Sequence, residues 1–298
     1  MISNQKSPYE KRAKLAADLK SGRLLQFPGA YNAMVGILIE QKGFDGVYIS
    51  GAVMANSMGF PDIGFTTMTE VTHFASQIAR ITSLPTIMDI DTGFGETMNV
   101  ARCIHEVEHA GLSGCHLEDQ VNPKRCGHLD NKTIVSVEEM LQKIQAAAKA
   151  KSDPNFIVMA RTDARASEGM EKTIDRVKAY VDAGADMIFP EAMYTEADFE
   201  LMRKAVSVPI LANMTEFGKS KLLTTSQLVN LGINMVIYPV TTQRLAMKAV
   251  EDGLDTIKEK GTQESVLENM QTRKRLYEVL KYEDYNEFDK NIYNFKLH

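Results

Sequence analysis

Eight short apolar runs alternate with longer helical patterns along this chain of 298 residues. The runs lie at residues 24–27, 47–50, 86–90, 114–118, 156–161, 187–189, 209–212 and 235–238. Strands that are buried on both faces of a parallel sheet have this dense apolar composition. The stretches 98–109 and 171–183 repeat apolar residues at helical spacing, and Gly111 and Gly184 follow them as helix-ending signals. We therefore predict an α/β fold, a (β/α)8 barrel of the TIM type.

The last part of the chain exceeds what a barrel needs. Residues 263–280 have the pattern of one charged helix, and residues 282–298 are polar and aromatic. We predict a single barrel domain over residues 1–298 in which 263–298 form a C-terminal helical extension. A doubly wound open sheet is the alternative, but no G-x-G-x-x-G sequence follows the first run, which weakens its dinucleotide-binding form.

Composition excludes several classes of partner. The net charge of −5 gives no basic surface for nucleic acid. The start of the chain lacks the apolar core of a secretory signal, and no apolar run approaches the ~18 residues that span a bilayer. Three cysteines without a C-x-x-C pair favour a reducing compartment. We expect a cytoplasmic protein that binds neither nucleic acid nor membrane.

Polar side chains gather where the apolar runs end. Active-site groups of a (β/α)8 barrel lie at the C-terminal ends of its strands, so these residues are the first candidates for the site. They are Tyr48, Ser50, Gly51, Asp89, Asp91, Glu118, Arg161, Glu191, Asn213 and Thr215.

Three of these residues favour a hard divalent cation. Asp89 and Asp91 are two residues apart and would share one face of a strand, where two carboxylates repel unless a cation or proton lies between them. With Glu118 they form an oxygen-rich set that suits Mg²⁺, or Mn²⁺. The alternative is that Asp91 only caps the turn near Gly93.

The sequence Lys-Arg-Cys-Gly-His at 124–128 is the second candidate feature. Positive neighbours stabilise the thiolate of Cys126, which can then exchange a proton near neutral pH. The alternative is a solvated basic loop with an idle thiol. Cys103 and Cys115 occupy core positions of a helix and a strand, so we expect them to be buried and structural.

Arg161 allows two interpretations. It could hold a substrate carboxylate with two parallel hydrogen bonds, or it could neutralise neighbouring acidic side chains. Asn213 and Thr215 would add neutral donors to the same ligand. The turn from Tyr48 through Ser50 and Gly51 to Ala52 offers backbone N–H groups to an anion.

These motifs resemble one enzyme family. The sequence at 124–128 is similar to the K-[KR]-C-G-H signature of the lyase branch of the isocitrate lyase and phosphoenolpyruvate mutase superfamily. The phrases LEDQ, GHLDNK, MARTDA, FPEA and ILANMTEFG also look like the 2-methylisocitrate lyases of that superfamily. The resemblance extends from about residue 12 to residue 285.

The resemblance implies roles for individual residues. Asp89 would bind the metal directly, and Asp62, Asp91 and Glu118 would hold its water molecules. Cys126 would be the general acid, with Arg125 and His128 beside it. The residues that would contact a tricarboxylate substrate are Tyr48, Ser50, Gly51, Ala52, Arg161, Glu191, Asn213 and Thr215. The resemblance also implies a homotetramer in which the C-terminal helix is exchanged between subunits.

The resemblance further implies Mg²⁺-assisted cleavage of 2-methylisocitrate to pyruvate and succinate, with Tyr48, or Glu118 through a water, as base. Isocitrate lyases resemble one another in carrying a Trp in the pocket that receives glyoxylate, whereas this chain contains no Trp. The resemblance therefore implies that Phe189, Ile237 and Pro239 line this pocket and leave room for the methyl group of pyruvate. A methyl-sized pocket discriminates by only ~1–3 kcal/mol, so cleavage of isocitrate to glyoxylate and succinate stays an alternative.

Other classes fit the sequence less well. A phosphonate mutase or oxaloacetate hydrolase would keep the Asp-x-Asp pair but would not need the cysteine motif. A Schiff-base aldolase would need a lysine at the end of a central strand, and a phosphate-binding isomerase would need glycine-rich loops after the last two strands. Neither feature is evident. A binding barrel without catalysis would not need the full set of strand-end groups.

Overall fold

All eight predicted strands are present in the computed structural model, which describes residues 6–125, 127 and 132–293. Each strand lies within two residues of its predicted position. The strands are β1 (Leu25–Pro28), β2 (Val47–Ile49), β3 (Thr86–Asp89), β4 (Gly114–Glu118), β5 (Ile157–Thr162), β6 (Met187–Pro190), β7 (Leu211–Asn213) and β8 (Met235–Tyr238).

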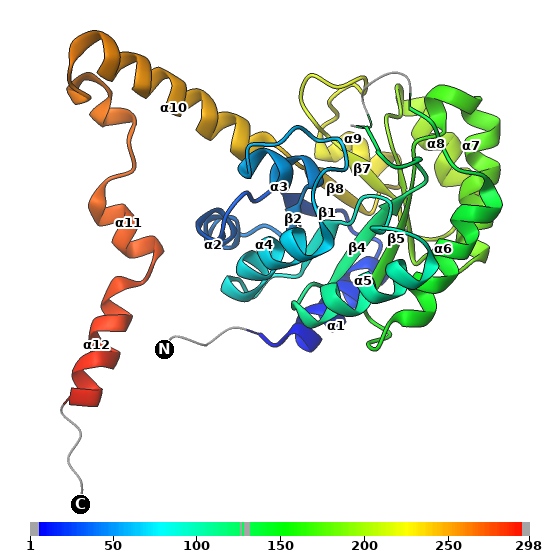
Figure 1. Ribbon diagram of the computed structural model, residues 1–298, viewed down its shortest axis with the longest axis horizontal. Helices are drawn as coiled ribbons and strands as arrows, with labels where there is room; N and C mark the ends of the chain where they lie inside the picture. The colour runs from blue at the N-terminus through cyan, green and yellow to red at the C-terminus, as the bar shows by residue number, and fades with distance from the viewer. Residues whose placement is uncertain (1–5, 126, 128–131, 294–298) are drawn as a thin grey trace, which may run out of the picture. The chain divides into compact units, whose positions relative to one another are not determined.

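The strands stand in the middle of Figure 1 with helices around them, and their pairing closes them into a ring. Strands β2 to β6 form one parallel sheet in chain order, and β1, β8 and β7 form another. Parallel bridges between Gly29 and Tyr48 and between Ile188 and Ile210 join the two sheets. The N–H of Ala30 donates to the carbonyl of Tyr48 at 2.9 Å, which continues the ladder across the first junction. The predicted (β/α)8 barrel is confirmed.

Helices surround the ring. They are α1 (Pro8–Lys20), α2 (Ala33–Gln41), α3 (Gly51–Ser57), α4 (Met68–Ile81), α5 (Thr97–His109), α6 (Val137–Ala150), α7 (Arg165–Asp182), α8 (Glu196–Ala205) and α9 (Thr225–Asn230). Gly111 and Gly184 follow α5 and α7 with φ of 92° and 110°, a conformation that glycine adopts without strain. Both predicted helix ends are therefore confirmed.

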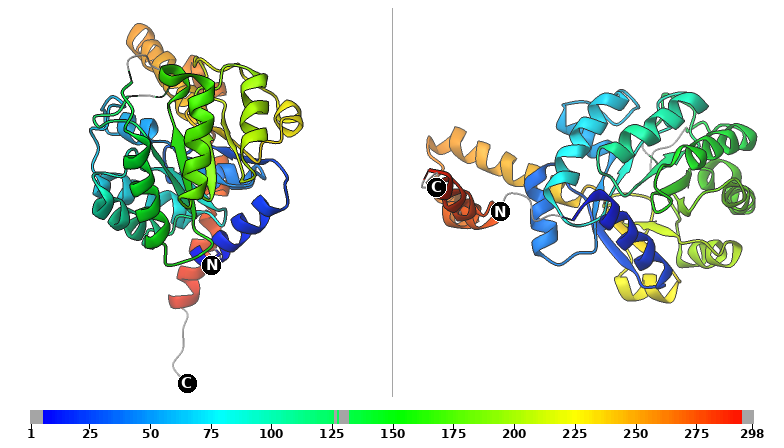
Figure 2. Two further views of the ribbon diagram at one scale, coloured as in Figure 1. Left: turned by 90° about the vertical axis from the view of Figure 1, so that its right-hand side faces the viewer. Right: turned by 90° about the horizontal axis from the view of Figure 1, so that it is seen from below.

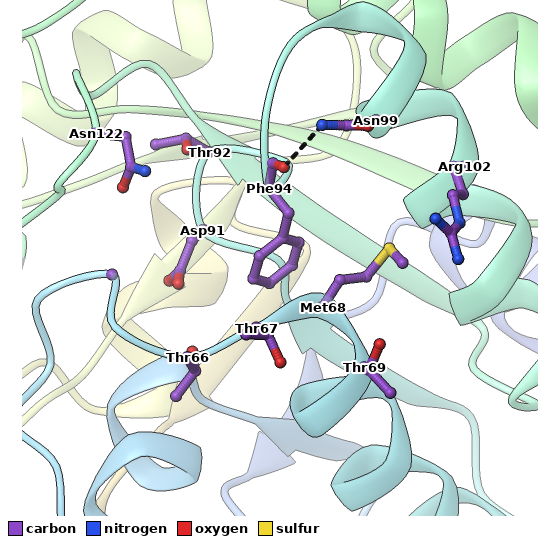
Figure 3. Close-up of a pocket in the computed structure, with 11 residues that line it drawn as sticks. Thr66, Thr67, Met68, Thr69, Asp91, Thr92, Phe94, Asn99, Arg102 and Asn122 are labelled. Atoms are coloured by element: carbon purple, nitrogen blue, oxygen red, sulfur yellow. Dashed lines mark hydrogen bonds between the residues drawn. The ribbon is translucent and has the colours of Figure 1, made fainter.

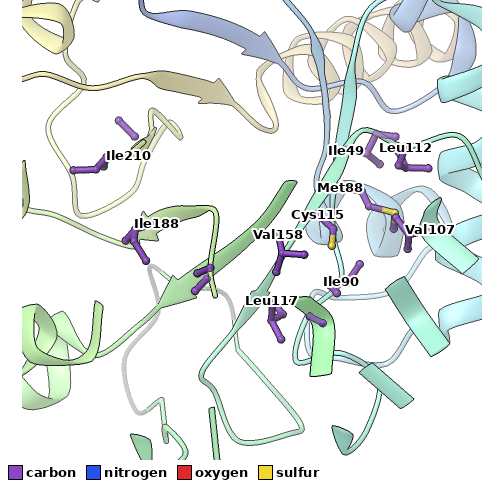
Figure 4. Packing of buried hydrophobic residues seen from close by; sticks show 14 of the residues in the cluster. Ile49, Met88, Ile90, Val107, Leu112, Cys115, Leu117, Val158, Ile188 and Ile210 are labelled. Atoms are coloured by element: carbon purple, nitrogen blue, oxygen red, sulfur yellow. The ribbon is translucent and has the colours of Figure 1, made fainter. Parts of the chain in front are cut away.

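The strands bury both faces. Inside the ring, Phe27, Met159 and Met235 pack with Leu15 and Leu19 of α1, which closes one end of the barrel and is seen from below in Figure 2. Between strands and helices lies a second apolar layer. Figure 4 shows part of it, and its residues include Ile49, Met88, Val107, Cys115, Leu117 and Val158. Since apolar side chains fill the N-terminal end of the ring, polar groups collect at the other end.

Cys103 and Cys115 are buried in this outer layer, as predicted. Burial raises the pKa of the Cys103 thiol to about 12. Burial also raises the pKa of Cys115 well above its usual value. Neither thiol is therefore a reactive group in the described part of the chain.

The chain divides into two compact units, and the boundary lies between Thr242 and Gln243. The second unit contains most of α10 (Thr241–Lys260), the 3₁₀ helix η1 (Glu264–Asn269), α11 (Arg273–Val279) and α12 (Tyr282–Tyr293). The prediction of one helix over 263–280 is wrong, because Met270 is extended and Thr272 caps a new helix. The single-domain assignment with an extension from 263 stays a prediction.

No helix in the described residues is long and apolar enough to cross a membrane.

Candidate active site

The strand ends bring the predicted polar residues to one end of the barrel. Asp89 pairs in register with His116, Glu118 with Arg161, and Arg161 with Phe189. Asn213 ends β7 opposite Ile237 of β8. Because all strands are parallel, these groups share the C-terminal end of the ring.

Asp89 and Asp91 meet beside the start of α3. The N–H of Gly51 donates to Asp89 Oδ2 at 3.3 Å. A Cβ at Gly51 would lie 2.8 Å from Asp89 Oδ2 and 3.1 Å from Asp91 Oδ1, so glycine is required there. The expected reason for this convergence is wrong, because β3 ends at Asp89 and Asp91 lies in a turn with φ of 48°. The turn, rather than strand alternation, directs the second carboxylate.

Lys124 inserts its ammonium group among the carboxylates. Its Nζ donates a hydrogen bond to Asp62 Oδ1 and lies 2.8 Å from Asp91 Oδ1. The side chain is only 2% exposed. Burial alone would lower the pKa of Lys124, but the surrounding carboxylates raise it well above its usual value. The sequence had indicated Lys124 only as a neighbour of the Cys126 thiol, so this contact is new.

Several buried carboxylate oxygens in the described residues lack hydrogen-bond donors. Both oxygens of Glu118 are in this state, and Asp91 Oδ1 has no described hydrogen-bond partner besides the Lys124 ammonium. Glu118 Oε2 lies 3.0 Å from Arg161 Nη1, but this ion pair lacks hydrogen-bond geometry. Burial raises the pKa of Glu118 well above its usual value, and it raises the pKa of Asp91 to about 6. These oxygens are therefore suited to accept from further donors.

This arrangement fits a hard cation bound through water. Within residues 6–125, 127 and 132–293, no three His, Cys, Asp or Glu side chains converge closely enough to bind a metal directly. The set is nonetheless made of carboxylates with unused buried acceptors, which suit a strongly hydrated ion. Asp89 as the single direct ligand, with water between the ion and Asp62, Asp91 and Glu118, stays a prediction that these positions permit.

Tyr48 and His116 form a buried pair inside the barrel. The Tyr48 hydroxyl lies 2.8 Å from His116 Nε2, and His116 Nδ1 lies 3.6 Å from Asp89 Oδ1. Burial lowers the pKa of His116 to about 4. Burial raises the pKa of Tyr48 well above its usual value. Both groups are therefore neutral at pH 7 and can share a proton.

His116 was not predicted from the sequence. It lies two residues before Glu118 on β4, so strand alternation directs both side chains to the same face. The same rule had been applied to Asp89 and Asp91, and applied to β4 it would have identified His116.

Arg161 is surrounded by acidic partners. Its Nε lies 3.0 Å from Asp163 Oδ2, and its Nη2 lies 3.3 Å from Glu191 Oε2, in addition to the Glu118 ion pair. The guanidinium carbon lies 5.2 Å from the centre of the Phe189 ring. These contacts match the neutralising role considered for Arg161. Its role in holding a substrate carboxylate stays a prediction.

The segment that carries the cysteine motif is described only in part. Cys126 and His128 lie outside the described residues. Gln120 holds the backbone of Arg125 with hydrogen bonds of 2.8 and 2.9 Å. A Cβ at Gly127 would lie 2.4 Å from Arg161 Nη2 and 2.5 Å from Glu191 Cγ. Arg125 is thus held by Gln120, two residues past the end of β4, and Gly127 lies close to the Arg161 and Glu191 side chains.

The remaining predicted residues line the inner wall or its edge. Phe189 and Ile237 are buried in the apolar interior with Tyr48, and Pro239 is also buried. Ser50 is the N-cap of α3, and Gly51 and Ala52 are its first residues. Glu191 follows β6 and accepts hydrogen bonds from Asn213 Nδ2 at 3.3 and 3.4 Å. Thr215 follows β7 and is buried.

Asp62, Asp89, Asp91 and Glu118 are together called the acidic cluster. A cavity of about 370 Å³ is lined in part by Asp91, a member of this cluster. Asp91 and Thr92 form one wall, and Figure 3 shows Thr66, Thr67 and Phe94 around the same space. Asn99 closes a corner by donating to the carbonyl of Phe94 at 3.2 Å. Asp91 links the cavity to the other carboxylates, and no sequence pattern had indicated the cavity.

Comparisons with known proteins agree on one family. The sequence pattern of the phosphoenolpyruvate phosphomutase family matches residues 15–258. A probable 2-methylisocitrate lyase 1 of Corynebacterium glutamicum is 53% identical over 297 residues, which are 99% of this chain and 97% of the relative. Oxaloacetate acetylhydrolase with 3,3-difluorooxalacetate is similar in structure, with a TM-score of 0.91, 31% identity and coverage of 98% and 100%. Phosphonopyruvate hydrolase with oxalate and Mg²⁺ has a TM-score of 0.86, 31% identity and coverage of 94% and 98%.

Proposed function

The chain belongs to the phosphoenolpyruvate phosphomutase family, and we propose that it is a carbon–carbon lyase that cleaves 2-methylisocitrate into pyruvate and succinate. Relatives named 2-methylisocitrate lyase span nearly the whole chain at 43–53% identity, which supports this substrate. The reaction would serve propionate breakdown by the methylcitrate cycle.

The observation that carries the proposal is the cluster of Asp62, Asp89, Asp91 and Glu118, which Arg161 adjoins through its ion pair with Glu118. A tricarboxylate with a tertiary alcohol needs a cation for its 2-hydroxyl and adjacent carboxylate, and basic groups for the rest of its charge. Mg²⁺, or Mn²⁺, would supply the Lewis acid, with Asp89 as direct ligand and Asp62, Asp91 and Glu118 behind its waters. Arg125, Arg161 and His128 would supply the positive charge.

The chain's own groups would move two protons. Tyr48 and Glu118, the latter through a water, are the two candidate bases for the 2-hydroxyl. The C2–C3 bond then breaks in a retro-aldol step, and its electron pair leaves with succinate in the aci-carboxylate form. The thiol of Cys126 would protonate that carbon, and the guanidinium groups would stabilise the dianion until it does.

The pocket residues support the larger keto product. Phe189, Ile237 and Pro239 would border the methyl group of pyruvate, and Ser50, Gly51, Ala52, Asn213 and Thr215 would bind carboxylates. Isocitrate lyase activity is the closest alternative. An oxaloacetate hydrolase is the other, favoured by the TM-score of 0.91 to oxaloacetate acetylhydrolase, although the intact cysteine motif is not needed for that reaction.

A homotetramer that exchanges C-terminal helices is part of the proposal. Leu254, Ile257, Phe288 and Ile292 of the second unit are between 45% and 61% exposed. Apolar side chains exposed at this density favour burial against another subunit.

One parallel assay tests the substrate. The purified protein is incubated with Mg²⁺ and with 2-methylisocitrate, isocitrate or oxaloacetate, and the keto product is identified in each case. We expect pyruvate from 2-methylisocitrate at the highest kcat/KM, and no turnover in EDTA. Glyoxylate from isocitrate, or oxalate from oxaloacetate, at a higher kcat/KM would overturn the assignment.

A further inference from the structure

Lys124 places a positive charge among the carboxylates that the proposed function assigns to the metal ion. Its ammonium contacts Asp62 and Asp91, and the carboxylates that hold its charge also include Glu118 and Asp89. These are the same four carboxylates that the proposed function assigns to the cation. A lysine with this burial is seldom found without such compensation, because an unpaired buried charge is costly.

The contacts of Lys124 use oxygens that a hydrated cation needs. Asp62 Oδ1 accepts the hydrogen bond of Nζ, and Asp91 Oδ1 lies 2.8 Å from the same atom. The bond to Asp62 and the short distance to Asp91 direct the ammonium between these two side chains. Water molecules on a divalent ion would have to donate to these oxygens, in the same small volume.

Electrostatic repulsion between the metal ion and the Lys124 ammonium also opposes their presence in the site together. A divalent ion beside Asp89 and an ammonium between Asp62 and Asp91 are like charges in a site that excludes most water, where such repulsion is weakly screened. Lys124 lies in an irregular segment after β4, outside any helix or strand, so its side chain can leave without unfolding the barrel.

We infer that Lys124 is an internal counter-ion that competes with the divalent cation for Asp62 and Asp91, so that metal binding displaces its ammonium group from the acidic cluster. The inference rests on the proposed metal site. It makes metal affinity a property of the segment that carries the cysteine motif as well as of the four carboxylates.

Binding of Mn²⁺ alone to the metal-free protein tests the competition. Free Mn²⁺ is measured by electron paramagnetic resonance during titration of the wild type, Lys124→Met and Lys132→Met. Lys132 is the matched control, because its side chain is also buried and pairs with Asp163 at 2.7 Å rather than with any of the four carboxylates. We expect Lys124→Met to bind Mn²⁺ about tenfold more tightly than the wild type, and Lys132→Met to change the affinity far less.

A second measurement does not depend on a variant. Acetylation of Lys124 by acetic anhydride, followed by mass spectrometry of the wild type, should be slow without metal and at least several-fold faster with Mg²⁺. Equal or weaker Mn²⁺ binding by Lys124→Met, together with unchanged acetylation, would overturn the competition alone. Absence of Mn²⁺ binding in every protein would overturn the metal site and, with it, the proposed function.

Discussion

His116 contributes a pH-dependent term to stability because it is buried uncharged. Its pKa is lowered to about 4 in the folded chain, whereas an unfolded histidine has a value near 6.5. The unfolded state therefore binds more protons between these values, and the folded state loses about 3 kcal/mol as pH falls from 6.5 to 4. Asp91 acts with the opposite sign, because its raised pKa of about 6 favours the folded state on protonation.

The substitution His116→Gln isolates the histidine term. We expect the wild type to lose more stability than the variant when the pH is lowered from 7 to 5, since Asp91 is present in both. Urea denaturation at the two pH values measures the difference. An identical loss in the two proteins would show that His116 does not remain neutral in the fold.

Gly127 is the residue whose contacts with Arg161 and Glu191 leave no room for a side chain. We expect Gly127→Ala to shift this backbone and lower kcat by about tenfold to a hundredfold, because misplacement of catalytic groups by ~1 Å has effects of this size. Thermal unfolding should change little, since the segment is outside the barrel strands. Wild-type kcat would contradict the close approach of Gly127 to the site.

Single residues also show where sequence reasoning ends. Asp89, Glu118 and Arg161 could be predicted, because each ends a strand that was recognised from its apolar run. The buried position of Lys124 could not, because its contact with Asp62 depends on the path of two irregular segments. No periodicity in the sequence specifies such a path.

At the scale of elements, Asp119 joins β4, β5 and α7. Its carboxylate accepts hydrogen bonds from Thr162 Oγ1 at 2.7 Å, from the Asp163 N–H at 2.8 Å and from the Tyr180 hydroxyl at 2.8 Å. Asp119 is fully buried, so each donor matters to the carboxylate. The network fixes the end of β5, which carries Arg161.

Loss of one donor tests this network. We expect Tyr180→Phe to lower the free energy of unfolding by about 1–3 kcal/mol, because it leaves a buried charged acceptor with one partner fewer. Tyr9→Phe is the control, since Tyr9 is 62% exposed and should change stability little. Equal stabilities of the two variants in urea would remove Tyr180 from the network.

The elements that were predicted correctly share a physical cause. Strands buried on both faces must be apolar throughout, so β1 to β8 can be recognised from composition. The break at residues 270–272 had no such signal, because η1 and α11 expose most of their side chains and carry no core pattern. The short helix α3 was not predicted, because its seven residues follow β2 after Ser50 alone and are too few to show a helical period.

At the scale of the whole molecule, the second unit exposes large apolar side chains. Leu254 and Ile257 of α10 are 61% and 47% exposed. If subunits exchange this unit, a charge on its apolar face should break the assembly. We expect Leu254→Asp to reduce the tetramer to smaller species in sedimentation velocity, whereas Lys258→Gln on the same helix should not. A tetramer that survives Leu254→Asp would place the interface elsewhere.

The account rests on one small ligand that contacts a cation at Asp89 and a proton donor at residue 126. A crystal structure of Cys126→Ser with Mn²⁺ and 2-methylisocitrate measures this directly, because anomalous scattering locates the ion. We predict a single Mn²⁺ bound to Asp89 and to the ligand, with the hydroxyl introduced at position 126 facing the carbon that becomes a methylene of succinate. An ion bound away from Asp89, or a ligand out of reach of residue 126, would contradict the account.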